Sequence, residues 1–261
     1  MGRTDSQFRY LIRLISEKTV LFTEMIHSNA ILYGNKNKLE EYSENENPIV
    51  LQLGGNDPES LAKVSKMANM FNYDEINLNL GCPSPRVSNG GFGAAMMNHP
   101  QLVCDCLNAI KENFNKEVSV KIRLGTDDND IDETLDNFVK EIESCDIKIF
   151  YVHARKAILK GLSPKQNREI PPLNYERVRK LKDDYPNLEI IINGGIKKLS
   201  FLQDNDLQNL DGIMIGREAY SNPLIFKDVD KKIKAELNRD ISIYEITQKM
   251  FDYFESLENE S

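Results

Sequence analysis

Short apolar segments recur along the chain, and most are followed by a stretch in which apolar residues repeat with helical spacing. Seven segments rich in β-branched residues predict strands, at Val20–Thr23, Ile49–Leu53, Glu75–Asn79, Val118–Ile122, Ile147–Val152, Glu189–Ile192 and Gly212–Ile215. Amphipathic spacing predicts helices at Ser6–Ser16, Pro58–Met70, Pro100–Phe114, Ile131–Ser144 and Tyr175–Asp184. This regular alternation indicates parallel strands joined by right-handed crossovers.

Two architectures have this alternation, an open doubly wound sheet and a closed (β/α)8 barrel. An open sheet concentrates ligand chemistry at one or two loops, whereas a barrel spreads it over the carboxyl ends of many strands. Polar or glycine residues follow nearly every predicted strand, among them Glu24, Gly54-Gly55, Gly81-Cys82, Arg123, Arg155, Gly194-Gly195 and Gly216-Arg217. The sequence therefore favours an α/β TIM barrel. No strand precedes the helix at Ser6–Ser16, so we expect the first barrel strand to be missing from this chain.

After Pro223 the pattern is helical only, at Asp228–Leu237 and Ser242–Leu257. We expect a barrel domain over residues 1–226 and the truncated beginning of a helical domain over residues 227–261. The polar stretch Asn35–Asn47 predicts an exposed loop. No apolar run reaches the roughly 20 residues of a membrane span, and the N-terminus has no signal-peptide core, so we expect a cytoplasmic protein without a membrane partner.

The charge is unevenly distributed along the chain. A net charge of −8, from 33 basic and 41 acidic residues, by itself argues against a nucleic-acid partner. Between His153 and Arg168, however, the chain has five basic residues and no acidic one. They are Arg155, Lys156, Lys160, Lys165 and Arg168. Such a run is typical either of a solvated face or of a surface that contacts phosphates.

The four cysteines are predicted to be reduced thiols, because a chain of this length does not need a disulfide framework and has no C-x-x-C pair. No metal-ligand spacing is found, and we expect no metal site. Cys104, Cys106 and Cys145 lie on or beside predicted helices, where buried apolar cysteines are common. Cys82 lies in a loop after a strand, and its thiol can donate a proton at neutral pH as well as act as a nucleophile.

Two glycine-containing turns, Asn193-Gly194-Gly195 and Gly216-Arg217, end the last two predicted strands. The corresponding loops of a TIM barrel often bind phosphate, because glycine lets backbone N–H groups approach an anion. The alternative is that these glycines only form tight turns. Gln52 and Lys121, near the ends of two other strands, could bind a heterocycle, although a lysine there is often a surface residue. Together these groups suggest a mononucleotide cofactor such as FMN.

The longest motifs are Leu51-Gln-Leu-Gly-Gly55, Asn77-Leu-Asn-Leu-Gly-Cys-Pro-Ser84, Val120-Lys-Ile-Arg-Leu-Gly125, Val152-His-Ala-Arg-Lys156, Ile192-Asn-Gly-Gly-Ile196 and Met214-Ile-Gly-Arg-Glu-Ala-Tyr220. In this order they resemble the tRNA-dihydrouridine synthase family. The segment from Lys160 to Leu173 resembles its bacterial type A subfamily in particular. The resemblance covers roughly Thr4 to Phe226.

The resemblance implies a TIM barrel that holds FMN, followed by a small helical domain that helps to bind tRNA. Its FMN-binding positions match Gln52, Lys121, His153, Asn193, Gly194, Gly195, Gly216 and Arg217. The catalytic proton donor matches Cys82, and positions that approach tRNA match Asn79, Arg86, Lys165 and Arg168. The basic stretch, including Arg155 and Lys156, is then expected to contact tRNA phosphates.

The implied reaction reduces the C5–C6 bond of a D-loop uridine, at tRNA position 20 or 20a. NADPH reduces FMN, the uridine is flipped out of its stack, hydride passes to C6, and Cys82 protonates C5. One alternative is an FMN barrel that acts on a free pyrimidine, which would need no basic rim. Another is a degenerate barrel that only binds RNA; the missing first strand favours it, and Cys82 with the flavin-matching residues argues against it.

Overall fold

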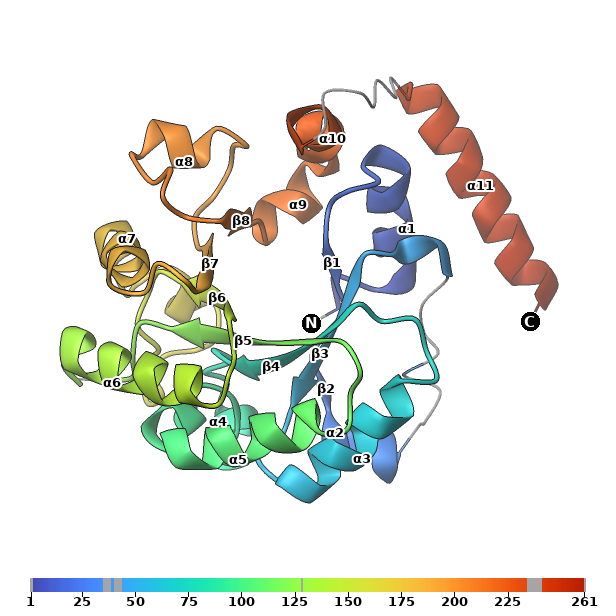
Figure 1. Ribbon diagram of the computed structural model, residues 1–261. Helices are drawn as coiled ribbons and strands as arrows, with labels where there is room; N and C mark the ends of the chain where they lie inside the picture. Colours follow the sequence, from blue (N-terminus) through green and yellow to red (C-terminus); the bar gives the residue numbers. More distant parts are fainter. Residues whose placement is uncertain (1, 35–38, 40–43, 128, 234–240, 261) are drawn as a thin grey trace.

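The computed structural model describes residues 2–34, 39, 44–127, 129–233 and 241–260. Its parallel strands form a curled half-barrel with helices on the outside (Figure 1). The strands are β1 Leu21–Phe22, β2 Ile26–His27, β3 Ile49–Gly54, β4 Glu75–Leu80, β5 Glu117–Arg123, β6 Ile149–His153, β7 Glu189–Asn193 and β8 Gly212–Met214. Their order is β1-β3-β4-β5-β6-β7-β8, with β2 beside β3, and no pairing joins β8 to β1 among the described residues. The predicted barrel architecture is confirmed.

The first predicted strand, Val20–Thr23, is shorter than expected and is followed by a separate strand. The Thr23 N–H still donates to the Val50 carbonyl, and the chain turns away from β3 after this residue. β1 pairs with Ile49 and Val50, and β2 resumes at Leu53 and Gly54. Between them the Thr23 side chain replaces a backbone carbonyl: its Oγ1 accepts a hydrogen bond of 3.0 Å from the Gln52 N–H. The backbone N–H of Gln52 therefore keeps a hydrogen-bond partner although the strand beside it is interrupted.

The helices are α1 Ser6–Ile15, α2 Ser28–Leu32, α3 Pro58–Ala68, α4 Pro85–Asn89, α5 Pro100–Lys111, α6 Ile131–Ser144, α7 Tyr175–Asp184, α8 Phe201–Asp204, α9 Arg217–Ser221, α10 Val229–Ile233 and α11 Ile243–Glu260. Short 3-10 turns occur at Glu44–Glu46, Gly93–Asn98, Gln166–Arg168 and Pro223–Asp228. Asp57, Asp130 and Asn174 cap α3, α6 and α7 by accepting a backbone N–H of the first turn. The longer predicted helices are confirmed, whereas α2, α4, α8 and α9 were not predicted because they are too short for a periodic pattern.

The C-terminal helices lie beside α1 (Figure 1). The Asp230 carboxylate in α10 accepts hydrogen bonds from the Ser16 hydroxyl, at 2.7 Å, and from the backbone N–H groups of Glu17 and Lys18. Of the predicted helix Asp228–Leu237, residues 234–237 lie outside the described residues. The domain boundary at residues 226/227 stays a prediction. Among the helices described, none is long and apolar enough to span a membrane.

The stretch Asn35–Asn47 is not simply an exposed loop, as the sequence predicted. Leu39 is fully buried, and its carbonyl accepts a hydrogen bond of 2.9 Å from the Tyr73 hydroxyl. Glu46 is also buried and forms an ion pair with Arg9 of α1. Residues 35–38 and 40–43 lie outside the described residues. A single leucine in a polar stretch is too weak a pattern to reveal such an anchor.

Alternation along the strands separates an apolar outer face from a polar interior. Leu78, Val120, Val152 and Ile192 are fully buried in the hydrophobic core. Their neighbours in sequence point to the other face, because successive side chains of a strand alternate. That inner face carries Asn77 and Asn79 of β4, Ser119, Lys121 and Arg123 of β5, Tyr151 and His153 of β6, and Asn193 of β7. The interior of this barrel is therefore available for polar chemistry.

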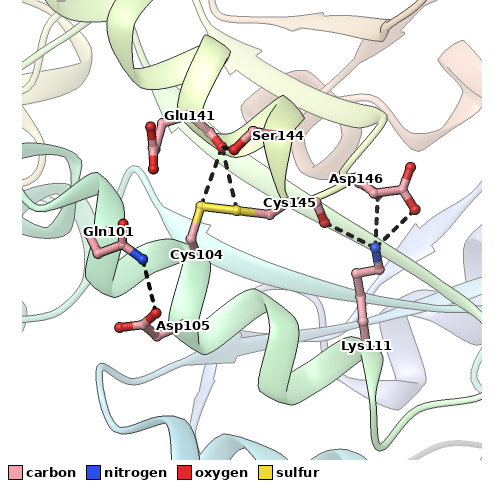
Figure 2. Close-up of a disulfide and its surroundings, with 8 residues drawn as sticks. All are labelled: Gln101, Cys104, Asp105, Lys111, Glu141, Ser144, Cys145 and Asp146. Atoms are coloured by element: carbon pink, nitrogen blue, oxygen red, sulfur yellow. Dashed lines mark hydrogen bonds and ion pairs between the residues drawn. A yellow bond between two sulfur atoms is a disulfide. The ribbon is translucent and has the colours of Figure 1, made fainter.

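One expectation about the cysteines is wrong. Cys104 of α5 and Cys145 at the end of α6 form a disulfide, with Cα atoms 5.9 Å apart (Figure 2). Beside it the Lys111 ammonium donates to the Cys145 carbonyl at 3.0 Å and to the Asp146 carboxylate at 3.0 Å. The pairing was not predictable from spacing, because the two cysteines are 41 residues apart and meet only when neighbouring barrel helices pack together.

We predict that breaking this disulfide destabilises the chain without changing its fold. Because the bond closes a loop of 41 residues, reduction should lower the free energy of unfolding by about 2–4 kcal/mol. Urea unfolding with and without dithiothreitol measures the effect. The C104A/C145A variant should not respond to dithiothreitol, whereas C106A should respond like the unsubstituted chain. Thiol titration of the denatured, unreduced chain should find only Cys82 and Cys106 free, and four free thiols would contradict the assignment.

Candidate functional site

The loop after β4 holds Cys82 rigidly at the carboxyl end of the sheet. The Asn79 carboxamide oxygen accepts the backbone N–H of Cys82 at 2.6 Å and that of Gly81 at 3.1 Å. On the other side, the Cys82 carbonyl accepts the Ala94 N–H at 3.0 Å. This contact requires glycine at position 93, where φ is +67° and a Cβ would lie 2.5 Å from the Cys82 carbonyl oxygen. The Cys82 thiol is free and partly exposed.

Polar side chains from three neighbouring strands lie beside this loop. Strand register places Arg123 next to His153 and His153 next to Asn193. The Lys121 ammonium lies 3.4 Å from the carboxamide oxygen of Asn193. The carboxamide nitrogen of Asn193 donates to the Met214 carbonyl at 2.7 Å. Sheet pairing therefore brings together three residues that the sequence predicted for the site, Lys121, His153 and Asn193.

The electrostatics of this cluster favour an anion. The pKa of His153 is strongly lowered by burial, and then by the positive charges of Arg123, Lys121, Arg155 and Arg217, so its imidazole is neutral at physiological pH. Burial lowers the pKa of Lys121 to about 8, and repulsion by Arg123 adds to this effect. Burial is also the main reason that the pKa of Arg123 falls to about 10. A bound anion would relieve this crowding of cations.

The glycine turn after β7 lies against His153. Gly194 and Gly195 have φ values of +119° and +70°, which glycine adopts readily. A Cβ at Gly194 would lie 2.9 Å from the His153 ring, so a larger residue would displace the imidazole. Gly216 and Arg217 are exposed at the beginning of α9, and the Arg217 guanidinium lies 3.6 Å from the Glu169 carboxylate. Both predicted anion-binding turns therefore lie at the carboxyl ends of their strands.

Gln52 occupies the interior beside β4. Its carboxamide nitrogen donates to the Asn77 oxygen at 3.0 Å, and its oxygen accepts from the Asn79 nitrogen at 2.8 Å. Both residues predicted on this side of the site, Gln52 and Asn79, are thus in direct contact. Each amide is nearly buried, at 8% exposure, so its orientation is fixed by its partners rather than by water.

The predicted basic stretch divides into exposed and buried members. Lys165 and Arg168 are exposed near the Gln166–Arg168 turn, and Arg86 is exposed on α4. Lys156 is partly buried, and its ammonium donates to the Asn129 carbonyl at 2.6 Å. Arg155 is buried, and its guanidinium donates to the Pro171 and Glu169 carbonyls. Arg155 therefore holds the loop in place, and its expected contact with tRNA stays a prediction.

Two residues that the sequence did not assign to the site hold its loops together. The buried Arg123 guanidinium donates to the Gly81 carbonyl at 3.0 Å and to the Asn167 carbonyl at 3.0 Å. The fully buried Asn167 in turn binds both the N–H and the carbonyl of Ile158 at 2.8 Å. Polar residues at alternate positions of an apolar strand, as in Ser119-Val-Lys121-Ile-Arg123, were the available signal for Arg123. Asn167 had none.

Comparison with known proteins agrees with this geometry. A family model described as dihydrouridine synthase (Dus) matches residues 1–261. The chain belongs to the dihydrouridine synthase family. It is 48% identical to a tRNA-dihydrouridine(20/20a) synthase of Escherichia coli O6:H1, over 97% of this chain and 76% of the relative. Proteins of the same name from Vibrio parahaemolyticus and Synechocystis are 49% and 46% identical, over 97% and 98% of this chain and 77% and 76% of the relatives.

In the part of this dihydrouridine synthase family member that the structure describes, no three or more His, Cys, Asp or Glu side chains form a cluster that could hold a metal ion. The candidate site instead consists of amides, cations, glycine turns and one free thiol at the carboxyl ends of the strands. Amides, cations and glycine turns are groups that can bind an anionic, heterocyclic ligand.

We predict that Arg123→Met loosens two loops at once in this dihydrouridine synthase family member. Removing a buried cation that binds three carbonyls should lower the free energy of unfolding by about 3 kcal/mol. Hydrogen exchange followed by mass spectrometry should show faster exchange in residues 80–84 and in residues 156–168. Arg179→Met is the matched control, since Arg179 forms surface ion pairs with Glu176 and Asp183 and should change little. Unchanged exchange in both loops of Arg123→Met would contradict the bridging role.

Proposed function

We propose that this chain is a flavin-dependent tRNA-dihydrouridine synthase of the cytoplasm, which uses NADPH-reduced FMN to reduce the C5–C6 bond of a D-loop uridine at position 20 or 20a. Relatives that are 46% to 49% identical and carry the name tRNA-dihydrouridine(20/20a) synthase support the substrate and position. The observation that carries the proposal is a group of cationic side chains near His153, at the same end of the strands as the Cys82 loop. These side chains are Lys121, Arg123, Arg155 and Arg217.

The residues present fit FMN. Its phosphate would bind at the two turns formed by Gly194-Gly195 and Gly216-Arg217, where backbone N–H groups and a guanidinium are available. Gln52, Asn193 and His153 offer neutral polar groups to the ring, and Lys121 adds a buried cation that lies close to Arg123. Bound FMN, once reduced by NADPH, would supply the hydride that is added to uracil C6.

Cys82 would donate the proton to C5, which completes saturation of the C5–C6 bond. A general acid must be positioned and protonated. Three backbone hydrogen bonds hold the Cys82 loop, two of them to Asn79, while the thiol itself is free. Asn79 would also lie near the target base. The thiolate left after proton donation would be stabilised by the nearby Arg123 and Lys121 cations.

The tRNA would contact the rim of the barrel mouth through basic side chains. Arg86, Lys165 and Arg168 are exposed and can reach phosphates without losing a partner in the folded chain that the structure describes. Lys156 would need to release the Asn129 carbonyl, and Arg155 would act by supporting the loop. Local positive charge of this kind can bind RNA although the net charge is −8.

The test of the cofactor is the visible absorption spectrum of the purified chain, followed by anaerobic addition of NADPH. We expect flavin bands that bleach, and then dihydrouridine in D-loop tRNA but none from free uridine. A protein that cannot be loaded with FMN would contradict the proposal. Reduction of free uridine instead of tRNA would favour an enzyme of free pyrimidines, and tRNA binding without flavin would favour a non-catalytic RNA-binding module.

We predict that Cys82→Ala keeps flavin bleaching by NADPH but lowers the rate of dihydrouridine formation at least about 100-fold, because the general acid is lost. Single-turnover reduction of tRNA uridine measures the effect. Cys106→Ala is the matched control: Cys106 is buried in α5, and burial raises its pKa to about 12. Turnover by Cys82→Ala at the rate of the control would remove Cys82 from the mechanism.

We also predict that the K165E/R168E double variant binds tRNA more weakly and with a smaller salt dependence. The slope of affinity against salt should fall by about one unit for each phosphate that is no longer bound. Binding measured between low and moderate salt gives the slope. The K66E/K140E variant makes the same change of net charge on exposed positions of α3 and α6 and should bind nearly as the parent. Equal weakening in the two double variants would contradict a specific role of Lys165 and Arg168.

A further inference from the structure

A continuous chain of hydrogen bonds crosses the interior of the barrel, from the Cys82 loop to Glu75 at the opposite end of β4. Asn79 binds Gln52, as described above, and Gln52 binds Asn77. The Asn77 nitrogen then donates to the Ser119 hydroxyl at 2.7 Å, and this hydroxyl donates to the Glu75 carboxylate. Glu75, Asn77 and Ser119, at the end of the chain far from Cys82, are 8%, 0% and 0% exposed, and none of them is among the residues predicted to bind a ligand.

Every hydrogen bond in this chain points in the same direction. The backbone N–H groups of Gly81 and Cys82 donate to Asn79, and each following side chain donates to the next until Glu75, which only accepts when ionised. A carboxamide can reverse its nitrogen and oxygen with almost no change of shape, so its own packing does not fix its direction. Backbone N–H groups, which can only donate, at one end and an ionised carboxylate, which can only accept, at the other do fix it.

The groups around Glu75 support its role as the acceptor. Ser119 binds one carboxylate oxygen, and the Tyr151 hydroxyl donates to the other at 3.3 Å. Burial raises the pKa of Glu75 to about 7, the like charges of Glu189 and Glu117 add to this rise, and the two hydrogen bonds oppose it. The protonated acid still has a carbonyl oxygen that can accept from Ser119, so the chain keeps its direction in both protonation states.

We propose that Glu75 and Ser119 are positioning residues for the site: as the acceptor end of the chain, they set the orientation of the Gln52 and Asn79 carboxamides and, through Asn79, the backbone of Cys82. The inference rests on the functions proposed above for these three residues. Neither Glu75 nor Ser119 is among the residues proposed to contact the flavin or the uridine, and their side-chain hydrogen bonds run to Asn77, Tyr151 and each other. They act on the site through Asn77, which loses the acceptor of its nitrogen when Ser119 loses its hydroxyl.

The test is hydrogen exchange of the Gly81 and Cys82 backbone amides, measured by NMR relative to core amides of α7 such as Leu181. Ser119→Ala leaves a buried amide nitrogen unsatisfied and should speed exchange of the two loop amides about fivefold. Glu75→Leu removes the terminal acceptor and should have a similar effect. Glu75→Gln keeps an acceptor oxygen and should stay within about twofold of the parent.

Ser65→Ala is the matched control for Ser119→Ala. Ser65 is a fully buried serine of α3 whose hydroxyl has no hydrogen-bond partner in the described structure, so its removal should leave the loop amides unchanged. If Glu75→Leu does not fold, Ser119→Ala and Glu75→Gln still decide the question. Exchange in Ser119→Ala equal to that in Ser65→Ala would overturn the proposal, as would a Glu75→Gln variant that folds but exchanges at least about fivefold faster than the parent.

Catalysis gives a second measurement. Under the proposed function, Ser119→Ala should lower kcat for tRNA about fivefold and leave KM nearly unchanged, because the exposed basic residues Arg86, Lys165 and Arg168 are not members of the chain of hydrogen bonds. A change confined to KM would contradict a positioning role. The exchange measurement needs neither flavin nor tRNA. A failure of the proposed function would therefore appear as a protein that forms no dihydrouridine while its loop amides still respond to Ser119 and Glu75.

Discussion

The alternation of side chains along a parallel strand is the constraint on which the rest of this structure depends. Apolar residues such as Leu78, Val120 and Val152 face the helices and form the core, and this leaves the residues between them pointing into the barrel. In this protein those residues are polar. They cannot be left without partners away from water, so they must bind one another, and the way they do so determines the shape and charge of the barrel mouth.

The polar side chains of the interior form two groups. On the side of β3 and β4, amides and a serine satisfy one another in a chain that ends at Glu75. On the side of β5 to β8, cations gather around His153. Burial, and then repulsion between positive charges, lowers the pKa values of Lys121, Arg123 and His153. The amide side satisfies its polar groups within the folded chain. The cationic side would be balanced by a bound anion, so it is the more informative side about function.

The loops are tied to this interior by a few buried polar residues. Arg123 connects the Cys82 loop to the loop that carries Lys165 and Arg168, and Asn167 holds that second loop in shape. Substrate contact at the rim and proton donation at Cys82 would thus depend on one guanidinium. The Cys104–Cys145 disulfide lies outside the barrel between α5 and α6 and stabilises the scaffold rather than the site.

The sequence by itself determined the parallel α/β barrel, most strand and helix positions, and the loops in which Cys82, Gly194-Gly195 and Gly216-Arg217 lie, because periodicity and turn residues are local signals. Its long ordered motifs also identified the family. Only the tertiary structure decided which residues meet. It buried Arg155, Leu39 and Glu46, paired Cys104 with Cys145, split the first strand at Thr23, and joined Glu75 to Cys82 through a series of hydrogen-bonded side chains. These contacts join separate strands and helices, and no local pattern encodes a partner that lies far away along the chain.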